Sequence, residues 1–228
     1  MEENKLVKNL NERYSNNPIL RGLIQLIPLG IGSGADVALV TTITNIREDR
    51  TRTFFDELNA GKIELNADLI KSEDFLHKFF ITTKTALNTR RREKIKLFAR
   101  LLLSSLKEDL IKSIDEYEEY LGILDDINIR ELYILVTLEK YLNNYPKLTE
   151  ENALQEVNKF WDSFSQEIMD KLKISKEEFR AFLTKLQRTG CYAAITGTYF
   201  DYDGDKGNLT PFYYKLKELI QLRAEDFI

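Results

Sequence analysis

The chain has 228 residues, with 33 Lys and Arg against 37 Asp and Glu and a hydrophobic share of 43%. This composition is typical of a folded globular protein and excludes an intrinsically disordered chain. The single cysteine, Cys191, excludes an internal disulfide, and the single histidine, His77, excludes a metal site built from several His or Cys ligands. We therefore expect a protein that needs neither a metal nor a cofactor.

The sequence contains no nucleophile elbow, P-loop or metal-ligand spacing that would indicate an enzyme. Carboxylates are abundant, but 31% of the chain is charged, so they are expected to be solvated, and no pair stands out as an acid–base couple. We therefore expect a non-enzymatic binding protein. The expected partner is a protein, with anionic lipid, nucleic acid and a second copy of the chain as alternatives.

The amino-terminal residues 1–14 alternate charged residues with leucine and valine. A signal peptide has a basic region followed by an apolar region and a cleavage site of small residues, and this order is absent here. An unpaired cysteine also suits a reducing compartment. The expected location is the cytoplasm, with membrane association as an open alternative.

Apolar spacing and Gly and Pro punctuation predict at least eight helices and one short region of strand. The fold class is therefore expected to be mainly α, a multi-helix bundle followed by a carboxy-terminal winged-helix-like module with one short β-hairpin. Ser72 is a plausible cap for a long helical stretch, which we expect to break near Asn88 and Thr89. Thr149 is expected to cap the helix before the module. The bundle helices are predicted at about residues 2–14, 18–27, 35–60, 72–106, 108–121, 128–143 and 150–172.

The carboxy-terminal residues 173–228 are expected to form a separate domain, and residues 1–172 the helical bundle. A capped helix over 175–189 precedes residues of high β-propensity, a turn at GDKG, and a last helix that Thr210 and Pro211 open. The order helix, helix, hairpin, helix is typical of a winged-helix module, with residues 175–189 in the position of the recognition helix.

Residues 19–46 form an apolar segment in which two interpretations stay open. Between Gly22 and Ile46 only Asp36 is charged, and a run of arginines follows directly, as expected at the cytoplasmic end of a membrane segment. Pro28 and several glycines instead favour a helical hairpin buried in the bundle. The membrane-segment candidates are Leu23, Ile24, Ile27, Pro28, Gly30, Gly32, Gly34 and Val37.

Residues 78–107 form a basic stretch, which contains nine Lys and Arg residues and a single acidic residue, Glu93. Such a stretch can hold phosphates or anionic lipid head groups. Alternatively, the acidic residues of 108–131, or those of another subunit, neutralise it. The candidates for binding an anionic partner are Arg90, Arg91, Arg92, Lys94, Lys96 and Arg100.

The predicted helix over 175–189 carries a basic face, formed by Lys176, Arg180, Lys185 and Arg188. This face would suit DNA. The expected wing, however, places Asp201, Asp203 and Asp205 at the tip of the hairpin, where they would face phosphate. A protein partner is therefore favoured for the module over DNA.

The order of these features resembles that of uncharacterised bacterial helical proteins and, more loosely, of the Abi-alpha proteins, which are associated by name with abortive phage infection. The resemblance is carried by LIQLIPLGIGSGADVALV, by the basic stretch and by the LTPF ending of the module. It implies a setting in bacterial defence and assigns no catalytic residue. The sequence therefore predicts a phage-defence or growth-arrest component acting through residues 19–46, with a cytoplasmic winged-helix DNA-binding regulator as the alternative.

Overall fold

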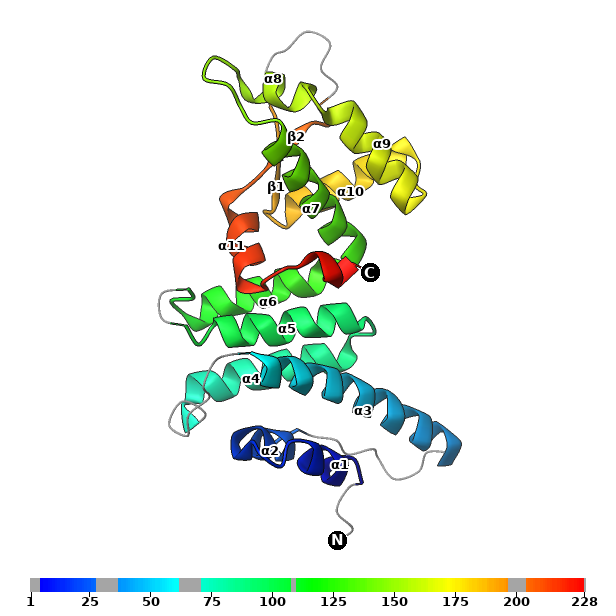
Figure 1. The fold of residues 1–228 in the computed structure, drawn as a ribbon, viewed down its shortest axis with the longest axis vertical. Coiled ribbons are helices and arrows are strands. Elements are labelled where there is room, and N and C mark those ends of the chain that lie inside the picture. Colours follow the sequence, from blue (N-terminus) through cyan, green and yellow to red (C-terminus); the bar gives the residue numbers. More distant parts are fainter. Residues whose placement is uncertain (1–4, 28–36, 62–70, 108–109, 197–203, 228) are drawn as a thin grey trace. The chain divides into compact units, whose positions relative to one another are not determined.

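The computed structural model describes residues 5–27, 37–61, 71–107, 110–196 and 204–227 (Figure 1). These residues are mainly helical and contain one two-stranded antiparallel sheet. The fold class expected from the sequence, mainly α with a short β-hairpin near the carboxy-terminal end, is confirmed.

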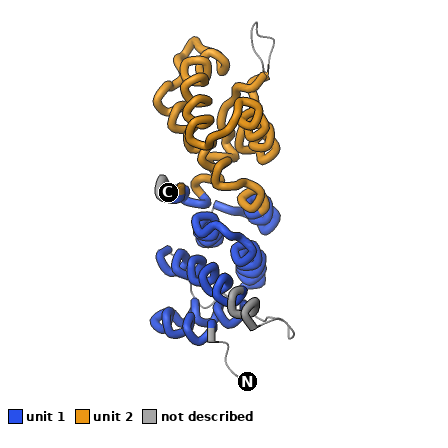
Figure 2. Tube along the Cα trace, turned by 90° about the vertical axis from the view of Figure 1, so that its right-hand side faces the viewer, with its two compact units in different colours: residues 1–121, 219–226, 228 blue, residues 122–218, 227 orange. Residues whose placement is uncertain are grey.

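The chain divides into two compact units (Figure 2). Unit 1 contains residues 1–121, 219–226 and 228, and unit 2 contains residues 122–218 and 227. The chain thus passes from one unit to the other within a helix and returns to unit 1 at Leu219. These units do not coincide with the expected division at residues 172 and 173.

Unit 1 is built around the long helix α3, which packs against α4 and α5 (Figure 1). Its core contains Phe54 and Phe55 of α3, Phe79 of α4 and Phe98 of α5, all 1% exposed or less. The helix α1 packs against α2 and α3. The helices of this half are α1 (Lys5–Arg13), α2 (Pro18–Gln25), α3 (Val37–Ala60), α4 (Glu73–Asn88), α5 (Arg92–Ser104) and α6 (Ile114–Asp126).

The expected cap and break of the long helical stretch are both present. The Ser72 hydroxyl accepts a hydrogen bond from the backbone N–H of Phe75 (3.2 Å) at the start of α4. The helix ends at Asn88 because Thr89 is extended, with φ −85° and ψ 133°. The stretch is therefore two helices, with Arg90 and Arg91 in the connection between them.

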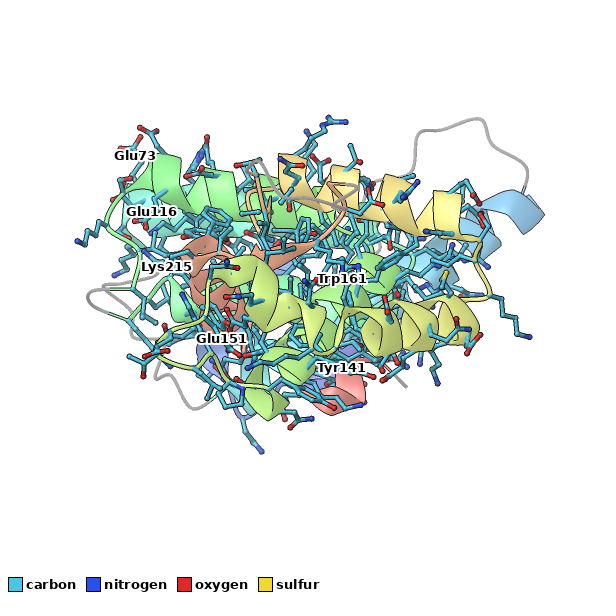
Figure 3. All side chains as sticks on the ribbon, turned by 90° about the horizontal axis from the view of Figure 1, so that it is seen from above. Glu73, Glu116, Tyr141, Glu151, Trp161 and Lys215 are labelled. Atoms are coloured by element: carbon cyan, nitrogen blue, oxygen red, sulfur yellow. The ribbon has the colours of Figure 1, made fainter. Side chains whose placement is uncertain are left out.

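Unit 2 has an aromatic core to which α9 and α10 both contribute. Trp161 and Phe164 of α9 lie edge to face, with ring centroids 5.3 Å apart, and Phe164 lies 5.8 Å from Phe179 of α10. Figure 3 labels Trp161 on α9 and Tyr141 on α7. The elements of this half are α7 (Ile129–Asn144), α8 (Ala153–Asn158), α9 (Trp161–Leu172), α10 (Lys176–Arg188), β1 (Tyr192–Ala194), β2 (Gly207–Leu209) and α11 (Pro211–Leu219). The 3₁₀ helix η2 (Ala224–Phe227) follows and, except for Phe227, belongs to unit 1.

The two strands pair antiparallel, with Tyr192 opposite Leu209 and Ala194 opposite Gly207. The Tyr192 ring lies over Gly207, and its hydroxyl donates to the Asp205 carbonyl (2.8 Å). A Cβ atom at position 207 would lie 2.4 Å from Cζ of Tyr192 and 2.3 Å from the Ala193 carbonyl oxygen. Only glycine therefore fits this position of the hairpin as it stands.

Two of the predicted helices differ from those observed. The helix expected over 108–121 spans Ile114–Asp126, because Ser113 accepts a hydrogen bond from the Glu116 N–H (3.1 Å) and so starts it later. The helix expected over 150–172 is interrupted between Asn158 and Trp161. Its cap is Asn152, which forms a reciprocal capping box with Gln155, and the expectation for Thr149 is therefore wrong.

Candidate functional site

The connection between α4 and α5 presents Arg90 and Arg91 to solvent and is tied to α3. Arg90 and Arg91 are exposed. Arg92 forms an ion pair with Asp49 of α3, with 2.9 Å between Nε and Oδ2. Nη1 of Arg50, also on α3, donates to the Leu87 carbonyl (2.5 Å) at the end of α4. These two contacts hold the connection in place while Arg90 and Arg91 remain accessible.

The start of α5 belongs to this connection. Arg91 occupies the N-cap position in an extended conformation and makes no side-chain cap hydrogen bond. The first-turn amides of a helix carry partial positive charge, which the carboxylate of Glu93 in the same turn opposes. Residues 90–93 line a shallow depression of about 440 Å³. The geometry favours an anion here.

The structure places the other predicted members of the basic stretch differently. Lys96 is exposed, and the Lys94 ammonium lies 5.7 Å from the centroid of the Phe98 ring. Lys78 lies 5.4 Å from the centroid of the Tyr117 ring. Burial lowers the pKa of Lys78, against the opposing effect of Asp74. These cations are therefore spread over several faces rather than gathered on one.

Arg100 is the clear exception among the predicted anion-binding residues. It is 3% exposed, and its guanidinium forms ion pairs with Glu57 of α3 and with Asp226 of the 3₁₀ helix η2, each at 2.7 Å. It also donates to the Gln221 carbonyl (3.1 Å). The prediction that Arg100 binds an external anion is wrong, because two internal carboxylates already occupy its donors.

The apolar segment 19–46 is only partly within the described residues. Leu23, Ile24 and Ile27 are buried, at 2%, 0% and 6% exposure. Val37 is the first residue of α3. Pro28, Gly30, Gly32 and Gly34 lie outside the described residues. None of the helices in the described part of the chain is both long and apolar enough to cross a bilayer.

Large apolar side chains are nevertheless exposed around this segment. Leu26 is 45% exposed after α2, Ile46 is 44% exposed on α3, and Phe80 is 44% exposed on α4. The neighbouring Phe79 is fully buried. The sequence did not indicate the exposure of Phe80. Adjacent phenylalanines can both be buried, as Phe54 and Phe55 are, so the pair Phe79 and Phe80 does not by itself show which ring faces solvent.

On α10, two of the four predicted basic residues are engaged within unit 2. Arg180 forms an ion pair with Asp205, and Lys185 lies 2.9 Å from the buried carboxylate of Glu131 on α7. Lys176 and Arg188 are exposed. Of the three acids expected at the hairpin, Asp205 pairs with Arg180 of α10, and Asp201 and Asp203 lie outside the described residues.

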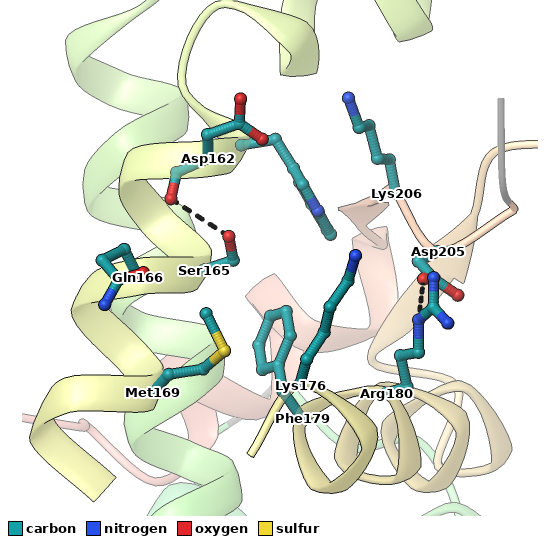
Figure 4. Close-up of a pocket in the computed structure, with 10 residues that line it drawn as sticks. Asp162, Ser165, Gln166, Met169, Lys176, Phe179, Arg180, Asp205 and Lys206 are labelled. Atoms are coloured by element: carbon teal, nitrogen blue, oxygen red, sulfur yellow. Dashed lines mark hydrogen bonds and ion pairs between the residues drawn. The ribbon is translucent and has the colours of Figure 1, made fainter. Parts of the chain in front are cut away.

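A pocket of about 400 Å³ opens between α9, α10 and the residues that precede β2 (Figure 4). Trp161, Met169 and Phe179 line it, together with polar residues. Figure 4 shows the Arg180–Asp205 pair at one side of the pocket, and the Lys206 ammonium donates to the Asn158 amide oxygen (2.6 Å). Two of its charged lining residues, Arg180 and Asp205, therefore pair with each other.

Within the described residues, no cluster of three His, Cys, Asp or Glu side chains could hold a metal ion. Burial raises the pKa of the Cys191 thiol to about 11, opposed by a hydrogen bond with Thr189. Such a thiol is a poor nucleophile at neutral pH. His77 lies on the surface of α4, 2.7 Å from Glu118.

The fold and these surfaces define a mainly α-helical protein with an exposed basic connection in unit 1 and a small hairpin in unit 2. Comparisons of the chain with models of protein families, with curated proteins and with solved structures found no match. The resemblance to Abi-alpha proteins and the assignment of the carboxy-terminal residues as a winged helix both stay predictions.

Proposed function

We propose that this chain is a non-enzymatic binding protein that associates with anionic membrane surfaces through unit 1. The observation that carries the proposal is the exposed pair Arg90 and Arg91 in the connection between α4 and α5. Basic residues near an anionic leaflet each contribute about 1 kcal/mol to binding. The uncapped start of α5 supports the same role.

Exposed apolar side chains on the neighbouring helices add a second component to this surface. Exposed Ile46 lies on α3, three residues before Asp49, the partner of Arg92. Exposed Phe80 lies on α4, and Arg50 donates a hydrogen bond to the end of that helix. Peripheral membrane binding combines buried apolar area with electrostatic attraction. A surface of this kind binds without a spanning helix.

Vesicle co-flotation tests the proposal. The protein is mixed with vesicles of phosphatidylcholine alone or of phosphatidylcholine with phosphatidylglycerol, at roughly physiological salt. We expect flotation with the anionic vesicles only, weakening as salt rises. The variant Arg90→Gln/Arg91→Gln should bind roughly thirtyfold more weakly, which corresponds to about 2 kcal/mol.

The matched control is Lys176→Gln/Arg188→Gln, which removes the same charge from exposed residues of α10 in unit 2. We expect it to float like the unaltered chain. Equal loss in both double variants would show that only net charge matters, and absence of flotation in every sample would overturn the proposal. Affinity for duplex DNA that Lys176→Gln/Arg188→Gln abolishes would instead support the DNA-binding alternative.

The setting in phage defence or growth arrest comes from the sequence resemblance alone, and we propose it as the context of membrane binding. Bacteria producing the chain should stop growing after phage challenge, whereas bacteria producing Arg90→Gln/Arg91→Gln should not. Equal growth of the two strains, with equal amounts of protein, would show that the membrane-binding arginines are not needed for defence.

A further inference from the structure

A pocket of about 320 Å³ in unit 1 lies between Ile27, α3 and α4. This volume falls within the range of small-molecule sites. Its apolar lining is formed by Ile27, Phe79, Phe80 and Leu87. The remaining lining residues are Arg47, Thr83, Lys84 and Asn88, so the described part of the lining contains no acid, and Lys84 supplies an exposed cation.

Thr83 provides an independent observation at this pocket. It is 5% exposed, and its hydroxyl has no hydrogen-bond partner among the described residues. The hydroxyls of Thr82 and Thr85 on the same helix donate to the carbonyls four residues earlier, at 2.6 and 3.0 Å. Buried hydroxyls are normally paired, and an unpaired one is costly. Among the described residues, the Thr83 hydroxyl is thus a donor without an acceptor, and it lies beside an apolar pocket.

From this combination we propose that the pocket binds a single-chain anionic amphiphile, namely a fatty-acid carboxylate. The alkyl chain would pack against Phe79, Phe80 and Leu87. The carboxylate would accept the hydrogen bond of Thr83 and pair with the ammonium of Lys84. Charge complementarity selects this occupant, because a neutral apolar ligand would leave the hydroxyl unpaired, and a cationic one would face the like charge of Lys84.

This proposal goes beyond the association with membranes, since the ligand is a monomer in solution rather than a bilayer. The probe is dodecanoate, titrated calorimetrically into the full chain below the concentration at which dodecanoate forms micelles. We expect saturable binding of one molecule. Dodecyltrimethylammonium, which has the same alkyl chain and a positive head group, should bind at least tenfold more weakly.

Two variants locate the site. Thr83→Val keeps the shape of the side chain and removes the unpaired hydroxyl, so its urea midpoint should be unchanged or higher while dodecanoate affinity falls roughly tenfold. Lys84→Gln, at an exposed position, should weaken binding by roughly fivefold. The matched controls are Thr85→Val and Lys96→Gln, whose side chains do not line the pocket, and we expect neither to change the affinity.

The outcomes are distinct from those of the vesicle experiment. Arg90→Gln/Arg91→Gln should lose vesicle flotation and keep dodecanoate binding. The proposal is overturned if dodecanoate does not bind, if it binds no better than dodecyltrimethylammonium, or if Thr83→Val and Lys84→Gln leave its affinity unchanged.

Discussion

Two arginines of the same basic stretch have opposite roles, which shows how much a single residue depends on its surroundings. Arg92 pairs with Asp49 at the surface, and its side chain is 64% exposed. Arg100 pairs with Glu57 and Asp226, and its side chain is 4% exposed. Water screens the first pair, whereas removal of the second cation would leave two carboxylates without compensation in the protein interior.

We expect Arg100→Ala to destabilise the protein by roughly 3 to 5 kcal/mol, as is usual when one partner of a buried ion pair is removed. Arg92→Ala, the matched surface change, should cost about 1 kcal/mol or less. Urea denaturation followed by circular dichroism gives both values. Equal shifts of the unfolding midpoint in the two variants would contradict the assigned difference in burial.

The sequence could not reveal the fate of Arg100, because its partners lie 43 and 126 residues away along the chain. The local excess of positive charge in the sequence groups Arg100 with Arg90 and Arg91. The exposure of those two was predictable, since they follow a helix break that Asn88 and Thr89 indicate. Thr83 was not predictable either, because an unpaired hydroxyl is a property of packing and leaves no pattern in the sequence.

Among the secondary-structure elements, helix ends with a local chemical cause were predicted well. Ser72 and Ser175 cap α4 and α10, and Thr210 accepts a hydrogen bond from the Tyr213 N–H (3.2 Å) at the start of α11. The errors at Ser113 and Asn152 arose where an apolar pattern continued past a competing cap. Side-chain caps thus decide where a helix starts when apolar spacing alone is permissive.

The cap of α10 provides a test at this scale. The Ser175 hydroxyl accepts from the Glu178 N–H (3.2 Å), and the Glu178 carboxylate accepts from the Ser175 N–H (2.8 Å). Ser175→Ala should therefore destabilise unit 2 by about 1 kcal/mol. Ser165→Ala, inside α9, is the control and should be neutral or slightly stabilising, because alanine favours the helix interior. Thermal melts that rank the two variants the other way would contradict the capping role.

The hairpin provides a second test. Gly207→Ala would force a methyl group against the Tyr192 ring and the Ala193 carbonyl, so we expect a loss of roughly 1 to 3 kcal/mol. Gly22→Ala, in α2, has no other atom within 4 Å of the added Cβ and should stabilise the protein by about 0.5 to 1 kcal/mol. Opposite signs of the two midpoint shifts are the expected result. A neutral Gly207→Ala variant would show that the hairpin relaxes without cost.

For the whole molecule, a buried tyrosine in unit 1 and a buried cysteine in unit 2 make stability depend on pH in the alkaline range. Burial raises the pKa of Tyr117 in unit 1 above its ordinary value, against the effect of a hydrogen bond with Thr82, and burial raises the pKa of Cys191 in unit 2 to about 11. The unfolded chain then releases these protons at lower pH than the folded chain. The stabilisation is complete below about pH 9 and is lost as pH rises through the folded pKa values.

We therefore expect the melting temperature to fall between about pH 9 and pH 11. Cys191→Ala and Tyr117→Phe should each make this fall less steep, whatever they do to stability at pH 7. Melts recorded across this range at constant ionic strength provide the measurement. A slope identical to that of the unaltered protein in both variants would mean that neither group contributes.

The only tryptophan of the chain, Trp161, is buried in the aromatic core of unit 2 at 5% exposure. When the protein is excited at the red edge of tryptophan absorption, only the indole of Trp161 emits. The wavelength of its emission reports whether unit 2 is folded. Unit 1, which carries both proposed binding surfaces, has no such fluorophore. A tryptophan introduced at Phe80 in a Trp161→Phe background would give unit 1 its own optical signal, placed where an incoming alkyl chain would displace water from the ring.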